Sequence, residues 1–190
     1  MYLIAGLGNP GKKYENTYHN LGFMAIDALS LKLGANFNKE AFGGLTATLN
    51  YGGEKVILLK PLTYMNLSGD SISAVMNFYK IPEENLIVLY DDTDIPKAAL
   101  RIRDKGSAGT HNGMRDIVLK LKSQNFKRIR IGSRQAAEDP RPLVDYVLSE
   151  IPESEKAAYK ATFSKAADAA IAFIKGESTE KIQSLYNGNI

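Results

Sequence analysis

The sequence predicts an α/β protein in which one domain, residues 1–190, holds a mixed, largely parallel, twisted sheet surrounded by helices. Three observations support this fold class. Short apolar runs alternate with segments of helical periodicity, which is the order that builds parallel strands. The run Leu86–Tyr90 is continuously apolar, as expected of a central strand buried on both faces. A Gly52-Gly53 pair lies between two strand-like segments and predicts a hairpin, so part of the sheet is antiparallel.

The first half of the chain contains three expected strands and two expected helices. Leu3–Gly6 is a short apolar run and predicts the first strand. Apolar residues at helical spacing predict a helix over Leu21–Leu33, which ends near a glycine, and another over Ser68–Tyr79, which ends before a proline. Leu45–Tyr51 and Lys55–Leu59 flank the Gly-Gly pair and form the two arms of the expected hairpin.

The second half continues the alternation after the central strand. We expect an edge strand over Leu100–Arg103, a helix over Asn112–Leu121 and a strand with alternating sides over Arg128–Gly132. From residue 152 onward the Ala- and Lys-rich composition predicts helix through residue 173 and again near residues 180–186. Residues 135–143 lack periodicity and predict a surface loop.

Composition excludes several classes of protein. The chain has no cysteine, which rules out disulfides, thiolate nucleophiles and thiolate metal sites. No apolar run approaches the roughly 18 residues that a membrane span needs, and the first residues do not form a signal peptide. We therefore expect a cytoplasmic protein that does not bind membranes. The two histidines are 92 residues apart and form no metal-ligand pattern in the sequence, so we expect no metal.

Positive charge is concentrated in one segment, although the net charge is only +3. Between residues 97 and 134 eleven basic residues face only two acidic ones. Such a segment suits a polyanion, because phosphate contacts supply affinity that does not depend on base sequence. A solvated surface of an ordinary protein would show the same charge, so this segment alone leaves both interpretations open.

The motif Gly6-Leu7-Gly8-Asn9-Pro10-Gly11 follows the first strand and has the spacing of a dinucleotide-binding loop. That function requires a helix that begins within the loop and directs its N-terminus at a pyrophosphate. Helical periodicity starts only near Leu21. Ribose binding would also require an acidic residue at the end of a second strand, whereas Asp27 lies inside the expected helix. We therefore interpret the motif as a sharp turn that holds Asn9 at the carboxyl edge of the sheet.

Polar motifs follow several strands at the point where each strand ends. Asn9 follows the first strand, Asn66 follows the hairpin and Asp91 follows the central strand. The carboxyl ends of parallel strands meet at one edge of a sheet, where open α/β sheets build their sites. We expect these side chains to converge with His19, which lies in the motif Tyr18-His19-Asn20.

These ordered motifs, from GLGNPG to the Asp145–Ser149 segment, strongly resemble the bacterial peptidyl-tRNA hydrolase family. The resemblance implies a metal-free, cofactor-free monomer that hydrolyses the ester between a peptide, or an N-blocked aminoacyl group, and the 3′ ribose of tRNA. It assigns His19 as the catalytic base, Asp91 as the carboxylate that orients it, and Asn9 as a residue that positions the substrate. The other matching positions imply contacts with the tRNA acceptor and 3′ CCA end: Tyr14, Tyr64, Asn66, Asn112, Arg103 and Arg130.

The expected chemistry explains these residue types independently of the resemblance. A neutral imidazole can activate water, and a carboxylate on its other nitrogen fixes the tautomer and raises its basicity. Asparagine amides can donate to a developing oxyanion without a charge to desolvate. Each residue also has a structural alternative: His111 is expected to hold its loop, and Asn66 and Asn112 could be helix N-caps.

The chain departs from the common family pattern in three places. Tyr18 stands where arginine more usually precedes the catalytic histidine, and Thr110 stands where the family often has glycine. Ile131-Gly132-Ser133-Arg134 replaces the commoner Ile-Gly-Ile-Gly-Arg-Pro segment. Two other functions remain open from the sequence: a noncatalytic RNA-binding module, which would bind tRNA without turnover, and a nucleotide-dependent oxidoreductase, which would bind NAD(P).

Overall fold

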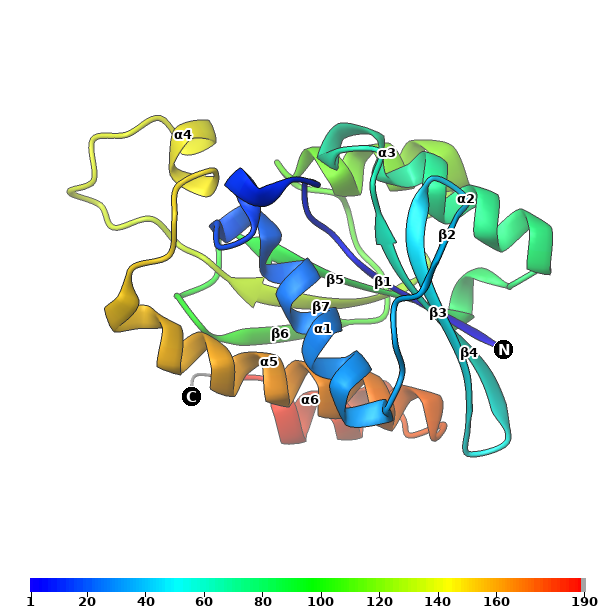
Figure 1. Ribbon diagram of the computed structural model, residues 1–190. Coiled ribbons are helices and arrows are strands. Elements are labelled where there is room, and N and C mark those ends of the chain that lie inside the picture. Colours follow the sequence, from blue (N-terminus) through cyan, green and yellow to red (C-terminus); the bar gives the residue numbers. More distant parts are fainter. Residues whose placement is uncertain (189–190) are drawn as a thin grey trace.

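A seven-stranded sheet runs through the middle of the molecule in the computed structural model, which describes residues 1–188 (Figure 1). Four central strands are mutually parallel, and antiparallel strands complete both edges. Across the sheet the order is β2 (Lys39–Ala41), β3 (Gly44–Tyr51), β4 (Glu54–Pro61), β1 (Tyr2–Gly6), β5 (Leu86–Asp92), β7 (Lys127–Gly132) and β6 (Leu100–Arg103).

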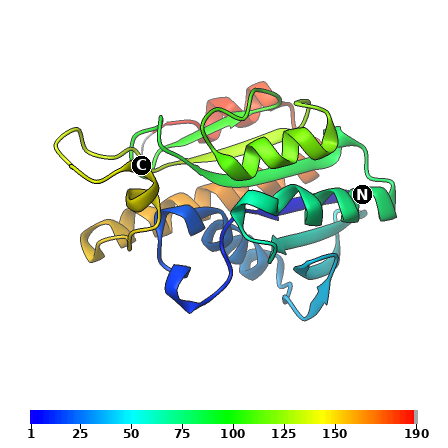
Figure 2. The same cartoon turned by 90° about the horizontal axis from the view of Figure 1, so that it is seen from above.

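Helices cover both faces of the sheet, as the views in Figures 1 and 2 show. One face carries α1 (Leu21–Leu33), α5 (Glu153–Ile174) and α6 (Thr179–Tyr186), and the other carries α2 (Ser68–Tyr79) and α3 (Asn112–Leu121). Alternate residues of β1 serve the two cores: Ile4 packs into the first, whereas Leu3 and Ala5 pack into the second. None of the helices within residues 1–188 has the length and apolar character that crossing a membrane requires.

The expected fold class is confirmed, and three expected helices, α1, α2 and α3, have the bounds that periodicity predicts. The central strand is buried over Leu86–Tyr90, and β6 lies at an edge as expected. Sequence patterns missed β2 and the short helix α4 (Leu143–Val147), which begins where a surface loop was expected to end. Such short elements depend on pairing and packing with distant residues, so they leave little periodicity to detect.

A close approach of backbones fixes the start of α1 over the ends of two strands. The amide of Phe23 donates to the carbonyl of Leu7 (3.0 Å), and the amide of Leu7 donates to the carbonyl of Leu89 (3.0 Å). A Cβ at Gly22 would lie 2.3 Å from the Leu89 oxygen and 2.5 Å from the Leu7 nitrogen. Only glycine permits this approach, which places the residues that precede α1 directly beside the end of β5.

The substitution Gly22→Ala should therefore destabilise the protein. The added methyl meets backbone atoms of Leu89 in β5 and of Leu7, the residue after β1, and overpacking of this kind costs about 1–3 kcal/mol. Urea unfolding would measure the loss. Leu31→Ala on the same helix is the matched control, because Leu31 is 84% exposed and its loss should change stability by less than about 0.5 kcal/mol. Equal stability of the two variants would contradict this role for Gly22.

Candidate functional site

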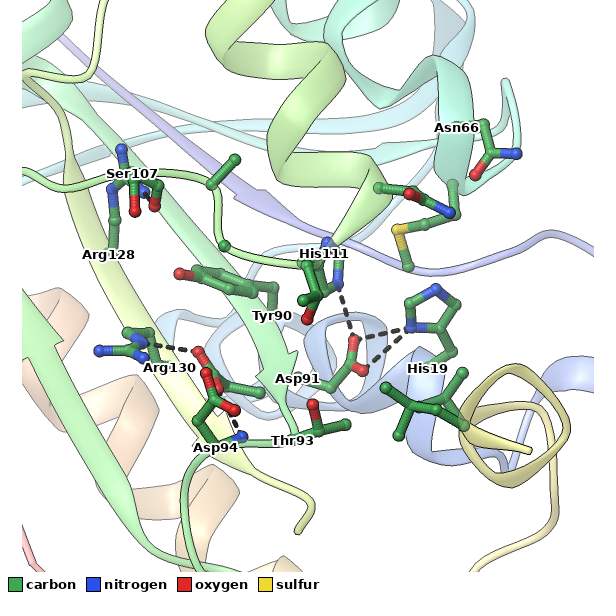
Figure 3. A pocket seen from close by; sticks show the side chains of 18 of the residues that line it. His19, Asn66, Tyr90, Asp91, Thr93, Asp94, Ser107, His111, Arg128 and Arg130 are labelled. Atoms are coloured by element: carbon green, nitrogen blue, oxygen red, sulfur yellow. Dashed lines mark hydrogen bonds and ion pairs between the residues drawn. The ribbon is translucent and has the colours of Figure 1, made fainter. Parts of the chain in front are cut away.

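A pocket of about 630 Å³ opens where β1 and β5 end (Figure 3). Asn9, His19 and Asp91 line one end of it, together with Asn66 and Asn112. Arg128 and Arg130 lie at the other, basic end in Figure 3, and Arg103, which pairs with Arg128 across neighbouring strands, also lines the pocket. The predicted convergence of polar residues at the carboxyl edge of the sheet is thus realised, and the pocket joins an amide-rich end to a cationic end.

The centre of the pocket is a carboxylate bonded to two imidazoles, as Figure 3 shows. Asp91 is only 1% exposed at the end of β5. Nδ1 of His19 lies 3.0 Å from each carboxylate oxygen of Asp91, and Nε2 of His111 lies 3.0 Å from Oδ1. His19 comes from the 3₁₀ turn Tyr18–Asn20 before α1, and His111 comes from the residue before α3. Three separate segments of the chain therefore meet at one buried charge.

The hydrogen bonds determine which nitrogen of each ring carries a proton. Nδ1 of His111 accepts from the backbone amide of Met114 (3.2 Å), so the neutral ring carries its proton on Nε2 and donates it to Asp91. His19 donates to Asp91 from Nδ1, which leaves the lone pair of its Nε2 free. Since His19 lines the pocket, this arrangement gives the pocket one basic imidazole nitrogen.

Electrostatics strengthen this base. Burial by itself lowers the pKa of His19, but the adjacent Asp91 carboxylate outweighs it and raises that pKa above the ordinary value. Burial also acts to raise the pKa of Asp91, yet its two histidine partners hold that pKa well below the usual range. Asp91 therefore stays ionised, and a protonated His19 is stabilised.

One ligand atom from each of His19, Asp91 and His111 lies within 4.8 Å of the others, a grouping that could hold a metal ion. The two histidines form no metal-ligand pattern in the sequence, but folding brings their ring centroids to 5.0 Å. The bond from Met114 nevertheless directs a proton of His111 at Asp91. Because His111 points an N–H group at the carboxylate, its lone pair faces away from the position a shared cation would take.

Asn9 is held so that its amide nitrogen is the available group. Its Oδ1 accepts from the backbone amide of Met65 (2.8 Å). Its backbone is bonded in both directions by Asn20, whose Nδ2 donates to the Asn9 carbonyl (3.0 Å) and whose Oδ1 accepts from the Asn9 amide (2.8 Å). With Oδ1 engaged, Asn9 offers the pocket an N–H donor.

The other amides and aromatic residues differ in where they lie. Asn66 and Asn112 are exposed and line the pocket. The side chain that caps α3 belongs to His111, so Asn112 is the first residue of that helix and not its N-cap. Tyr64 lines the rim, is 57% exposed and adopts φ 62°, a left-handed value that is costly for a side chain. Among residues 1–188, Tyr14 is not one of those that line the pocket.

The basic end is organised by one ion pair and one buried cation. Nε of Arg130 donates to Asp92 (2.7 Å), and although burial opposes it, this bond raises the pKa of Arg130. Arg103 is exposed at the edge strand. Arg128 is almost fully buried, donates to the carbonyls of Ser107 and Gln124, and forms no ion pair within the described chain. This end of the pocket therefore has an excess of positive charge.

The short helix α4 adds an apolar wall to the pocket. Leu143, Val144, Val147 and Leu148 line it, and Leu143 and Val144 are exposed. Exposed aliphatic side chains beside a polar site are typical of a binding surface.

The glycine-rich motif after β1 does not have the structure of a dinucleotide site. A 3₁₀ turn follows it at Lys12–Tyr14, and α1 begins only at Leu21. The position of a Cβ on Gly8 lies 2.6 Å from the ring of Phe23, so protein side chains fill the space above the turn. The motif serves to turn the chain sharply and place Asn9, as its sequence predicted.

Three residues of the site were not identified as such from the sequence. His111 was expected to hold its loop, and it does cap α3, but it also bonds Asp91. Asn20 clamps Asn9, and Arg128 lies buried at the basic end. The position of Asn20 next to His19 was the one available signal, whereas the roles of His111 and Arg128 depend on residues far away in the sequence.

Comparison with known proteins gives a consistent result. A family model described as "Peptidyl-tRNA hydrolase" matches residues 3–190. The chain is 50% identical over 188 residues to a peptidyl-tRNA hydrolase of a Thermoanaerobacter species, and the match covers 99% of this chain and 100% of that protein. It is 48% identical to the peptidyl-tRNA hydrolase of Listeria monocytogenes, with 89% and 90% of the two chains covered.

Solved structures of peptidyl-tRNA hydrolases have the same fold as this chain. The crystal structure of peptidyl-tRNA hydrolase from Acinetobacter baumannii superimposes with a TM-score of 0.89 at 33% identity, covering 98% of this chain and 96% of that one. A peptidyl-tRNA hydrolase crystallised with N-propanol gives a TM-score of 0.92 at 32% identity and covers 100% and 95% of the two chains.

The substitution Asp91→Asn should lower the pKa of His19. Burial, which lowers that pKa, persists in the variant, whereas the carboxylate that raises it is gone. In the wild type His19 therefore loses its proton at a higher pH than in the variant. An NMR titration of the His19 ring would measure both values.

Asp92→Asn is the matched control, since it removes the same charge one residue further along and Asp92 pairs with Arg130 instead of an imidazole. We expect a much smaller change in the His19 pKa in this control. If Asp91→Asn left the titration of His19 where it is in the wild type, the assigned electrostatic role of Asp91 would be wrong.

Proposed function

The chain belongs to the peptidyl-tRNA hydrolase family, and we propose that it cleaves its substrate with a water molecule activated by His19. Peptidyl-tRNA hydrolases are carboxylic ester hydrolases: they split the ester that joins a peptide to the 3′ ribose of tRNA. The observation that supports the mechanism is the bond between His19 and the buried Asp91 carboxylate. Asp91 accepts a hydrogen bond from Nδ1 of His19, so Nε2 of His19 is free at the pocket.

In the first step Nε2 of His19 takes a proton from water while the oxygen attacks the ester carbonyl. The imidazolium that forms is stabilised by Asp91, which stays ionised because its own pKa is depressed by the two histidines against the effect of burial. General-base assistance of this kind contributes about 10²–10⁴-fold to a rate. His111 keeps Asp91 in position through its own bond to Oδ1.

In the second step the tetrahedral intermediate collapses. Its oxyanion accepts hydrogen bonds from asparagine amides, for which Asn9 is prepared because its Oδ1 is engaged by Met65. The bond to the ribose 3′ oxygen breaks, and the imidazolium of His19 returns its proton to that oxygen. The products are a peptide with a free carboxylate and a tRNA with a free 3′ hydroxyl, which recycles the tRNA.

The two ends of the pocket support a binding mode for the tRNA acceptor end. The 3′ CCA end lies among Asn9, Asn66 and Asn112, Tyr64 at the rim offers a face for stacking, and Tyr14 contributes from outside the pocket. Phosphates of the acceptor bind Arg103 and Arg130, whose guanidinium groups face the same pocket. The apolar wall of α4 faces the peptide. We propose that the enzyme acts as a monomer in the cytoplasm, where translation produces its substrate.

A direct test uses release of N-acetyl-amino acid from a blocked aminoacyl-tRNA. The wild type should cleave the blocked ester and leave the unblocked aminoacyl-tRNA largely intact, and His19→Ala should lower kcat by at least about 10²-fold because the general base is lost. The variant must remain folded by circular dichroism and bind uncharged tRNA as tightly as the wild type. Tight tRNA binding without cleavage by the wild type would instead favour a noncatalytic RNA-binding module.

Salt dependence tests the basic end of the pocket. Binding of uncharged tRNA should weaken steeply with salt, and Arg130→Ala should reduce the slope of log affinity against log salt by roughly one. Lys160→Ala, which removes an exposed charge on α5 outside the pocket, should leave the slope unchanged. If Arg130→Ala and the wild type had identical slopes, Arg130 would not contact a phosphate of the tRNA.

A further inference from the structure

Behind His19 lies a cluster of side chains that joins four segments of the chain. Tyr18, the residue before His19, is 1% exposed, and its hydroxyl donates to Oε2 of Glu155 on α5 (2.6 Å). Lys97 donates to the Tyr18 hydroxyl (3.2 Å) and to Oε1 of Glu155 (2.5 Å). The ring of Tyr18 stacks on Tyr146 of α4, with centroids 4.7 Å apart and planes inclined by 21°.

The backbone of the same turn is attached to the segment between α4 and α5. The amide of Tyr18 donates to the carbonyl of Ser149 (3.3 Å), and the amide of Ile151 donates to the carbonyl of Asn16 (2.8 Å). Tyr159 packs edge-on against the ring of Tyr18 at 6.1 Å. The turn that carries His19 is therefore held from its buried side by α4, α5 and the segment between them.

Lys97 gives this cluster its connection to Asp91. Lys97 lies in the segment between β5 and β6, a few residues after Asp91 at the end of β5. Its ammonium lies over the rings of Tyr18 (5.4 Å) and Tyr146 (5.9 Å) as well as against Glu155. The chain that leaves Asp91 and the turn that carries His19 are thus joined twice, once by the His19–Asp91 bond and once through Lys97 and Tyr18.

We propose that Tyr18, held by Glu155 and Lys97, is a positioning residue that sets the alignment of His19 with Asp91 and with the apolar wall of α4. This inference rests on the proposed role of His19 as the base. Burial and the bond to Glu155 raise the pKa of Tyr18, so its hydroxyl remains a donor at neutral pH. The guanidinium of Arg141 lies 5.2 Å from the centre of the Tyr146 ring. Tyr146 of α4 therefore contacts both Arg141 and Tyr18, and these contacts hold α4 against the turn that carries His19.

The cation in this cluster is the Lys97 ammonium, which donates to both the Tyr18 hydroxyl and Oε1 of Glu155. Tyr18, Lys97 and Glu155 therefore form one hydrogen-bonded unit.

The test compares Tyr18→Phe, Glu155→Gln and the double variant. Tyr18→Phe keeps the aromatic stack and removes only the hydroxyl. Small misplacements of a catalytic group can cost as much as about 10²-fold in rate, and we expect each single variant to lower kcat about tenfold with KM changed less than about twofold. The double variant should lose little more than either single one, because the two residues act through the same bond.

Two readouts separate positioning from general loss of stability. A loosened His19–Asp91 pair should lower the pKa of His19, seen by NMR titration and as a shift of the acidic limb of the kcat/KM profile to lower pH. Thr162→Val is the matched control: Thr162 is a buried α5 residue whose hydroxyl bonds the Ala98 carbonyl (2.7 Å). This variant should lower the melting temperature without changing kcat or the His19 titration.

The proposal would be overturned by a Tyr18→Phe variant with wild-type kcat and a wild-type His19 titration, or by losses that add fully in the double variant. If Thr162→Val and Tyr18→Phe changed kcat and the His19 titration equally, the role of Tyr18 would be structural only. Failure of the proposed function is seen separately, because His19→Ala would then retain activity. The NMR titration reports the alignment of His19 in either case.

Discussion

A single buried carboxylate organises the functional end of this protein. Asp91 is removed from water at the end of β5, where an unpaired charge would be strongly destabilising. Two imidazole N–H groups from distant segments stabilise that charge. Their bonds also fix the turn before α1 and the loop before α3 relative to the sheet. The same interaction that makes the buried charge tolerable therefore assembles the site and gives His19 its basicity.

The sheet makes this arrangement possible. Because β1 and β5 are adjacent and parallel, Asn9 and Asp91 leave the sheet at the same edge. Gly22 lets α1 approach the ends of both strands, and His19 precedes that helix by a single 3₁₀ turn. Backbone contacts thus bring the base near its carboxylate, and the side chains of Asn20 and Tyr18 hold the final geometry.

The pocket separates two kinds of chemistry along its length. Its polar end presents neutral amides and one imidazole nitrogen, which suits an ester carbonyl and an oxyanion. Its basic end presents guanidinium groups, of which Arg130 is oriented by Asp92 and Arg128 is buried without an ion pair in the described chain. The guanidinium groups therefore lie where they can bind phosphate and at a distance from His19, whose pKa a nearby cation would lower.

The sequence alone determined the fold class, the bounds of the three amphipathic helices and the motifs of the site, because periodicity, glycine turns and polar residues after strands are local properties. The position of Asn9 in a turn and not in a dinucleotide loop also followed from local pattern. Only the tertiary structure decided that His111 shares Asp91 with His19, that Arg128 is buried in the pocket, and that Tyr18 meets Lys97 and Glu155. These contacts join residues 20 to 137 positions apart, and no local pattern encodes which distant side chains will meet.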